Sequence, residues 1–307
     1  QFKMRSLKSI IFLLIIAVGC SSPEEKNYDQ YQGVWKRIGT VKYENQVAVD
    51  TFFFPEGKVI PNRREPEVSV TGARYKVYAD GHTIWFYSRD GYDKGPDGYA
   101  KLTYSMRNDS LFETFKGGFW HDKFSKSPNI NRLMNEGYKA KISIDGDIYT
   151  QVRMNPNGKF SYGEIYKRID TYNVNPTNLT GTYNRISTIR IRNGKKSDTI
   201  DWGSSTGKNI GAFQIVADSK RMWAFNFESL DSLGKDRNPG SVLLSNYKIN
   251  GDIINDTLIW ATNPARNTWS RLRNNKRTRN FELNDGKYGI ITLDENKNGQ
   301  IAIFEKQ

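Results

Sequence analysis

The sequence predicts an all-β chain folded as two tandem antiparallel β-barrels of about eight strands each, with one short helix per domain. Short runs of aromatic and β-branched residues recur from Tyr31 onward, separated by clusters of Gly, Asn, Asp or Pro. The second half of the chain repeats the order of the first. No cysteine follows Cys20, so the folded part has no disulfides and depends on burial and backbone hydrogen bonds.

The first half contains nine runs that predict strands. They lie near 33–43, 48–54, 67–78, 82–88, 98–106, 110–116, 139–144, 147–154 and 159–168. Several alternate between apolar and polar residues, as in 139–144 (KAKISI), which predicts a solvated face. Asp-Gly and Asn-Gly pairs between the runs predict tight turns. Residues 127–137 predict a short helix, with Ser127 as the N-cap and Gly137 as the stop.

The internal repeat sets the domain boundaries. Residues 33–38 (GVWKRI) correspond to 181–186 (GTYNRI), 83–86 (TIWF) to 221–224 (RMWA), and 163–167 (GEIYK) to 299–306 (GQIAIFEK). The order never changes, so two diverged copies of one β domain are expected. The boundaries predict a first barrel over 31–169, a polar linker over 170–178 and a second barrel over 179–307.

The N-terminal segment predicts export. Three basic residues precede the apolar run 10–18, and small residues lead to Cys20, which predicts a signal peptide over 1–19. The ending Ala17-Val18-Gly19-Cys20 resembles the lipobox of bacterial lipoproteins, which implies a lipid anchor on Cys20 and a lipidated tether over 20–30. A free thiol or an intermolecular disulfide at Cys20 is the alternative.

The residues after Cys20 suggest where the anchored protein is located. Ser21 is not the aspartate that retains lipoproteins in the inner membrane, and the pair Glu24-Glu25 resembles the surface-export signal of Bacteroidota lipoproteins. These resemblances imply a protein anchored in the outer membrane and facing the cell surface.

A second resemblance concerns the barrels. Gly33-x-Trp35 on the first strand and Tyr166-Lys167-Arg168 on the last resemble the lipocalin pattern and are similar to the lipocalin-like domains of Bacteroidota lipoproteins. The resemblance implies that Trp35 fills the closed end of the barrel and that Arg168 covers its ring by a cation–π contact.

The expected pocket extends this resemblance to both copies. Trp85, Tyr183 and Trp223 are the further candidates for barrel closure or a ligand pocket. The second copy departs from the pattern, with Tyr183 in place of the tryptophan and Lys306 in place of the arginine. The first copy is therefore the expected ligand carrier.

The chain is basic, with 46 Lys and Arg against 33 Asp and Glu. Both halves share the excess, which predicts an ordinary solvated surface and leaves open attraction to anionic glycan. The densest basic run is Arg271, Arg273, Lys276, Arg277 and Arg279, which predicts a solvated helix face or a glycan contact. Nucleic acid is not an expected partner of an extracellular lipoprotein.

Other motifs are weaker indications of a functional site. Residues 294–305 fit the EF-hand loop, but strand-like runs flank them, which favours a hairpin turn. Residues 203–208 fall one residue short of a P-loop. The histidines are His82 and His121, which are expected at the surface or as caps and are too few for a zinc site, so neither a metal nor a cofactor is expected. Phe119, Trp120 and Phe124 predict either an aromatic platform for carbohydrate or barrel-end core.

These patterns favour a binding or accessory lipoprotein whose barrels hold a small apolar or amphipathic ligand. The alternative is a structural subunit of an outer-membrane complex for glycan uptake or secretion. No paired acid and base or activated nucleophile is evident, so an enzyme is not expected. The expected partners are the membrane through Cys20, an apolar ligand or anionic glycan, and an outer-membrane protein complex.

Overall fold

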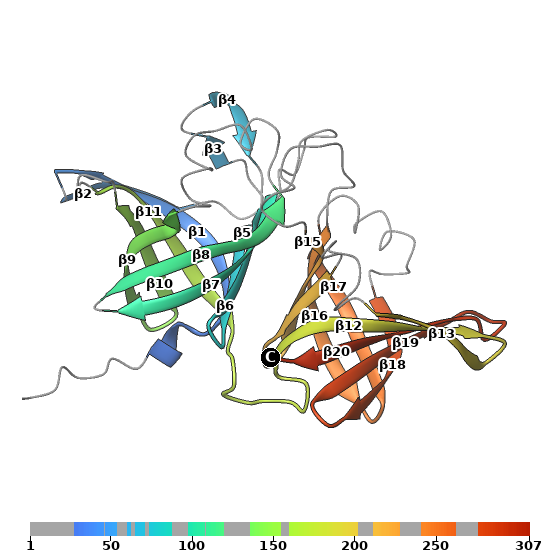
Figure 1. The fold of residues 1–307 in the computed structure, drawn as a ribbon. Helices are drawn as coiled ribbons and strands as arrows, with labels where there is room; N and C mark the ends of the chain where they lie inside the picture. Colours follow the sequence, from blue (N-terminus) through green and yellow to red (C-terminus); the bar gives the residue numbers. More distant parts are fainter. Residues whose placement is uncertain are drawn as a thin grey trace, which may run out of the picture. The chain divides into compact units, whose positions relative to one another are not determined.

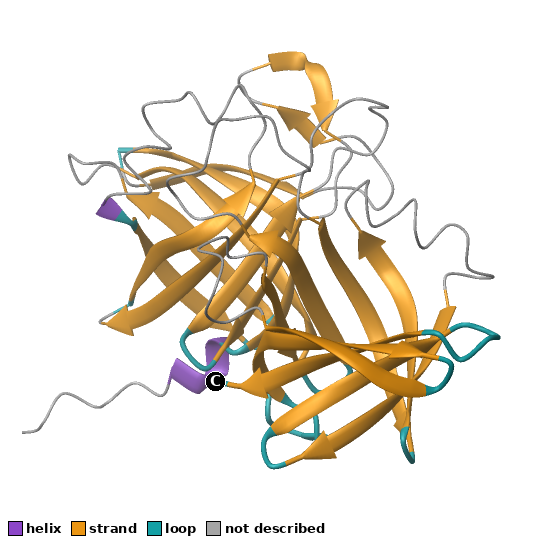
Figure 2. Cartoon of the chain, turned by 45° about the vertical axis from the view of Figure 1, so that its right-hand side comes forward, coloured by secondary structure: helices purple, strands orange, loops and turns teal. Residues whose placement is uncertain are grey.

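The fold consists of two closed antiparallel barrels of eight strands (Figure 1). The computed structural model describes residues 28–45, 47–53, 60–62, 65–70, 74–87, 98–107, 109–119, 136–154, 160–201, 211–227, 241–261 and 276–307 of the chain. Apart from the 3-10 helix η2 (Tyr28–Tyr31), the elements of this described part are strands (Figure 2).

The first barrel uses the strands from β1 to β11. They are β1 (Gly33–Glu44), β2 (Val47–Phe53), β5 (Arg74–Ala79), β6 (His82–Tyr87), β7 (Gly98–Arg107), β8 (Ser110–Phe119), β9 (Tyr138–Asp145), β10 (Ile148–Met154) and β11 (Phe160–Asp170). Neighbours in sequence pair as hairpins from β5 to β11, and β11 pairs with β1 to close the ring. A separate pair is formed by β3 (Ile60–Asn62) and β4 (Glu65–Val70).

Strands β2 and β5 share one place in this ring. Gly33–Lys36 of β1 pair with β5, whereas Gly39–Glu44 pair with β2. The nine paired strands therefore make a barrel with eight positions, and β2 extends along the distal half of β1.

The second barrel repeats this arrangement. Its strands are β12 (Gly181–Arg192), β13 (Lys195–Asp201), β14 (Gly211–Val216), β15 (Lys220–Phe227), β16 (Ser241–Asn250), β17 (Ile253–Ala261), β18 (Lys276–Asn284), β19 (Lys287–Leu293) and β20 (Gly299–Lys306). Strand β20 closes onto β12, and β14 and β13 pair with successive halves of β12.

The strand registers confirm the predicted two-barrel repeat. Trp35 pairs with Arg168 in the first barrel, and Tyr183 pairs with Lys306 at the same place in the second. The first strand of each barrel has an irregularity two residues later, between Arg37 and Gly39 and between Arg185 and Ser187. Such bulges bend a strand locally and are built-in features of a fold.

Each barrel begins with a glycine for a steric reason. Gly33 has a φ of 135°, and a Cβ there would lie 2.6 Å from the carbonyl oxygen of Asp170. Gly181 has a φ of 152° and would meet the Lys306 side chain at 2.7 Å. The positive φ favours glycine at both positions, and at Gly33 the backbone of the last strand also leaves no room for a Cβ.

The predicted strands agree with the structure except in one region. The run 67–78 was expected to be one strand, but it contains the end of β4 and most of β5, with 71–73 outside the described residues; β3 was not predicted. Residues 127–135 of the expected helix also lie outside the described residues, as do 262–275 in the second copy. Among the described residues, no helix is long and apolar enough to cross a membrane.

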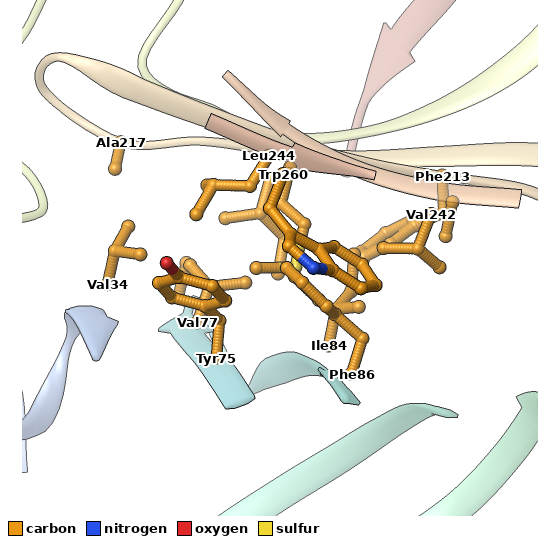
Figure 3. Packing of buried hydrophobic residues seen from close by; sticks show 14 of the residues in the cluster. Val34, Tyr75, Val77, Ile84, Phe86, Phe213, Ala217, Val242, Leu244 and Trp260 are labelled. Atoms are coloured by element: carbon orange, nitrogen blue, oxygen red, sulfur yellow. The ribbon is translucent and has the colours of Figure 1, made fainter. Parts of the chain in front are cut away.

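Two hydrophobic clusters lie on opposite faces of the strands. One fills the second barrel and includes Tyr183, Trp223, Tyr288 and Phe304. The other combines outward residues of β5 and β6, such as Val77 and Phe86, with residues of β14 to β17 (Figure 3). Because side chains alternate along a strand, the residues between these outward positions of β5 and β6 point into the first barrel.

Candidate functional site: the two barrel interiors

The closed end of the first barrel is built around Trp35, which is fully buried. Its indole Nε1 donates a 2.8 Å hydrogen bond to the carbonyl oxygen of Tyr31 in η2. The Arg168 guanidinium lies 4.2 Å from the Trp35 ring centroid and donates a 2.7 Å bond to the carbonyl oxygen of Gln32. The expected cation–π contact is therefore present, and the segment before β1 is fixed across the barrel end.

The second barrel closes in the same way with different residues. Lys306 Nζ donates a 3.1 Å bond to the carbonyl oxygen of Thr180, as Arg168 does to Gln32. Leu179 is fully buried one residue before Thr180, where the first barrel has Tyr31. Burial raises the pKa of Tyr183 to about 12, so its hydroxyl stays protonated. The departures from the first-copy pattern thus preserve the closure.

Beyond Trp35, a buried polar cluster occupies the first barrel. Lys76 Nζ donates to Gln151 Oε1 at 2.8 Å and lies 3.4 Å from Glu113 Oε1. The Tyr78 hydroxyl donates to the same Glu113 oxygen at 2.8 Å. Tyr149 donates to Gln151 at 2.7 Å. Gln151 Nε2 donates to the hydroxyl of Tyr138 on β9 at 2.9 Å, so residues of four strands, β5, β8, β9 and β10, meet in this cluster.

A second polar group lies beside it. Arg37, whose side chain is 1% exposed, forms a 2.9 Å ion pair with Glu164. Arg74 approaches the same carboxylate at 3.7 Å, and the Tyr166 hydroxyl donates to it at 2.7 Å. Burial raises the pKa of Glu164, but Arg37, Lys76 and Arg74 outweigh burial and hold it at about 2. This carboxylate is therefore ionised at neutral pH.

The tyrosines of the first barrel stay neutral. Burial, followed by the nearby carboxylate charge, raises the pKa of Tyr78, Tyr149 and Tyr166 well above the usual range. Their hydroxyl groups therefore serve as hydrogen-bond donors and acceptors at neutral pH. The interior presents fixed charges and hydroxyl groups at short range.

The second barrel also contains a buried charge cluster. Arg221 and Arg279 both donate through Nη2 to one oxygen of Asp256, and the Ser245 hydroxyl donates to the other oxygen at 3.2 Å. The two guanidinium carbons lie 4.2 and 4.6 Å from the Trp223 ring centroid. Burial raises the pKa of Asp256, but the two arginines outweigh it and lower the pKa.

The registers show which features the two interiors share. In the first barrel, Glu113 lies two residues after Leu111, which pairs with Ala140. In the second barrel, Asp256 lies two residues after Ile254, which pairs with Arg279 at the corresponding place, so Glu113 and Asp256 occupy equivalent positions. An inward carboxylate is thus common to both barrels.

Other inward positions differ between the copies. The first barrel has Gln151, Glu164 and Tyr166 where the second has Ile290, Ala302 and Phe304. The first interior is therefore the more polar of the two along its last two strands.

The structure brings some predicted site residues together and leaves others undescribed. Trp35 and Arg168 are in contact, and Tyr183 and Trp223 lie inside the second barrel. Trp85 lies on β6 and is half-buried. Cys20, Trp120, Phe124 and His121 lie outside the described residues, as does the side chain of Phe119.

Two expectations about single residues need correction. Arg279 was expected on a solvated helix face or at a glycan contact, but it lies on strand β18 and is 6% exposed inside the barrel. His82 was expected at the surface or as a cap, but it is half-buried with its ring 5.5 Å from that of Phe213. Burial lowers the pKa of His82.

Sequence reasoning missed the buried polar residues. Lys76, Glu113, Gln151, Arg221 and Asp256 were not singled out, although each lies within a predicted strand or repeat segment. These residues could have been found as charged or amide side chains at inward positions of the alternating pattern. They were not singled out because charged and amide residues are also common at the solvated positions of strands.

The EF-hand-like segment is a hairpin turn between β19 and β20, as its flanks predicted. Asp294 Oδ1 accepts bonds from the backbone nitrogens of Asn296 and Asn298 at 2.9 and 2.8 Å. The carboxylate therefore caps its own turn. Within the described ranges, no group of three or more His, Cys, Asp or Glu side chains is placed to hold a metal ion.

One of the solved structures similar to the chain is a crystal structure of a lipocalin-like protein. This crystal structure, from Bacteroides uniformis, is 15% identical to the chain and covers 43% of this chain and 100% of its own, with a TM-score of 0.28. The fold assignment rests on the strand pairing above. No protein-family model and no curated protein matches the chain.

Proposed function

We propose that the chain is a non-enzymatic binding lipoprotein of the outer membrane, anchored through Cys20, whose first barrel holds a small amphipathic ligand. The observation that carries this proposal is the cluster of Lys76, Glu113 and Gln151 at inward positions of that barrel. Buried charges are costly unless paired, and an apolar filling would stabilise a purely structural barrel at least as well. A polar interior supports a binding role.

The cluster also indicates the chemistry of the ligand. Lys76, Gln151 and the neighbouring tyrosines can rearrange their hydrogen bonds to accept a polar group. Leu102, Phe115 and Ile142 are buried on the same inward face, since Ile142 pairs with Gln151, Leu102 with inward Thr83, and Phe115 with Leu102, and they can contact an apolar portion. An amphipathic molecule with a hydrogen-bonding end satisfies both regions, whereas a purely apolar ligand would leave the cluster unused.

The test is native mass spectrometry of the whole protein purified from its own membrane. The wild-type protein should carry an additional small-molecule mass. Gln151→Ile and Tyr166→Phe, which introduce the residues of the second barrel, should each reduce the ligand-bound fraction about tenfold, because a lost hydrogen bond to a buried group costs about 1–3 kcal/mol.

Lys167→Gln is the matched control. Lys167 is exposed on β11 next to Tyr166, so its substitution should leave the bound fraction unchanged. Wild-type protein without bound mass, or equal occupancy in all variants, would remove the support for a ligand in the first barrel. Thermal unfolding of each variant separates loss of binding from loss of folding.

A structural subunit remains the second candidate, because one strand exposes apolar side chains. Val47, Val49, Phe52 and Phe53 of β2 are 43–64% exposed. Within the described residues, β2 pairs with β1 on one edge and with no strand on the other. Unpaired, apolar edges are sites where another chain can dock.

A further inference from the structure

The interior of the second barrel contains more positive than negative charge. Arg221, Arg277 and Arg279 lie on the same inward faces as Asp256, because Arg221 and Arg279 contact it and Arg277 is its cross-strand partner. In the described part of the chain, Arg221 and Arg279 share this one acidic partner. Two of the arginines are almost fully enclosed, at 1% and 6% exposed.

Several donors of these arginines are unused. Nε and Nη1 of Arg221 and Nε of Arg279 are buried without a hydrogen-bond partner among the described residues. A buried guanidinium normally satisfies its N–H groups, since an unpaired buried donor is costly. Burial and the neighbouring Arg221 lower the pKa of Arg279 to about 9, and the ion pair with Asp256 offsets this lowering only in part.

The first barrel shows that the shared carboxylate does not require these arginines. Its equivalent, Glu113, is paired with Lys76 and Tyr78. The first barrel has Thr83, Tyr138 and Ala140 at the places of Arg221, Arg277 and Arg279, as the registers show. The three arginines are thus specific to the second barrel and exceed what Asp256 needs.

We propose that the interior of the second barrel binds an oxyanion group through Arg221 and Arg279. The free N–H groups of a planar guanidinium match the paired oxygens of phosphate or carboxylate. Trp223 contacts both guanidinium groups and fixes them before the anion arrives. This site is independent of the ligand proposed for the first barrel.

Two probes distinguish the sources of such a group. Inorganic phosphate represents a free anion, and dodecyl phosphate represents the headgroup of an amphiphile. Titration of the whole purified chain should shift the side-chain Nε–Hε resonances of Arg221 and Arg279, because these are the unpartnered donors. Binding of both probes assigns a free oxyanion, and binding of dodecyl phosphate alone assigns an amphiphile headgroup.

Substitutions then locate the site. Arg279→Ala, which introduces the first-barrel residue, should weaken the Kd of the bound probe at least tenfold. If the alanine variant does not fold, Arg279→Lys takes its place in the test. It keeps the charge but removes the planar donors, so it should also weaken binding. Arg192→Gln removes an exposed arginine of the same barrel and should change the Kd less than twofold.

Two results would overturn the inference. One is the absence of any shift of the buried Nε–Hε resonances with either probe. The other is an equal loss of affinity in Arg279→Ala and Arg192→Gln, which would assign binding to the surface charge. Gln151→Ile in the first barrel should leave probe binding unchanged, so failure of the first-barrel proposal and failure of this one are distinguishable.

Discussion

At the residue scale, Glu164 makes the stability of the first barrel depend on pH. Its folded-state pKa of about 2 lies below its ordinary value of 4.5 because of Arg37, Lys76 and Arg74. A depressed carboxyl pKa contributes stability that is fully present above pH 4.5 and is lost as the pH falls toward 2. Glu164→Gln should lower the unfolding free energy at pH 7 by roughly 2–4 kcal/mol, since it leaves buried Arg37 without its carboxylate.

The measurement is urea unfolding of wild type and variant between pH 2 and 7. The difference between them should shrink as the pH falls from 4.5 to 2. Glu305→Gln is the control, because Glu305 is 45% exposed in its ion pair with Lys287 and such pairs contribute about 0–1 kcal/mol. A pH-independent difference for Glu164→Gln would contradict the assigned ion pair.

Individual residues were the least predictable part of this chain. Trp35 and Arg168 could be paired from sequence because Gly33-x-Trp35 and Tyr166-Lys167-Arg168 resemble the lipocalin pattern. Glu113 and Asp256 could not, since alternation shows which face a residue occupies but not which distant strand supplies its partner. Lys76 lies 37 residues from Glu113 in the chain.

At the element scale, the two edge strands β2 and β13 differ in a way that predicts behaviour in solution. Val47 and Phe53 occupy the places of Lys195 and Asp201 in the second barrel, as the pairings with β1 and β12 show. Charged side chains protect an edge strand from pairing with other chains. We expect β2 to promote association and β13 to resist it.

Reciprocal substitutions test this difference. Val47→Lys with Phe53→Asp should reduce concentration-dependent association in sedimentation velocity, with less than about 0.5 kcal/mol change in stability at these exposed positions. Lys195→Val with Asp201→Phe should increase association of the second barrel. Association unaffected by either pair would exclude β2 as a docking edge.

The sequence was sufficient to predict where strands occur, but not where one strand ends and the next begins. Alternation and Asp-Gly turns located β6 to β11 within a few residues. The run 67–78 was predicted as one strand because β-branched and aromatic residues recur along it on both sides of Gly72. Its two halves belong to different sheets, since β4 pairs with β3 and β5 pairs with β1 and β6. Partner choice depends on tertiary contacts, which override local propensity.

At the scale of the whole molecule, the predicted linker is held by hydrogen bonds to a distant turn. Asp218, in the turn between β14 and β15, accepts bonds from the backbone nitrogens of Asn173, Val174 and Asn175. Asp170 likewise accepts from the backbone nitrogens of Ser219 and Lys220. The repeat predicted a linker over 170–178 but not its hydrogen bonds to Asp218 and Ser219, which lie in a turn far along the chain.

The outward hydrophobic cluster leads to a prediction about cooperativity. Phe86 of the first barrel stacks on Trp260 of the second with ring centroids 4.2 Å apart, inside a cluster drawn from both sheets (Figure 3). Such shared burial should make Tyr31–Gln307 unfold in a single transition. Trp260→Ala should remove about 3–5 kcal/mol of unfolding free energy and separate the transition into two.

Differential scanning calorimetry checks this prediction, with Phe112→Ala as the control. Phe112 lies in the first barrel with 36% exposure and is not part of the cluster, so its loss should lower the Tm slightly and preserve one transition. A wild-type chain that already unfolds in two steps, or a Trp260→Ala variant that keeps one, would show that the cluster does not couple the barrels. Coupling matters for both proposed sites, because the shared cluster uses the outward residues of the strands whose inward residues form those sites. In the first barrel Val77 is next to Lys76, and in the second barrel Met222 is next to Arg221. Anion binding in the second barrel should then raise the Tm of the single transition in which Tyr31–Gln307 unfolds.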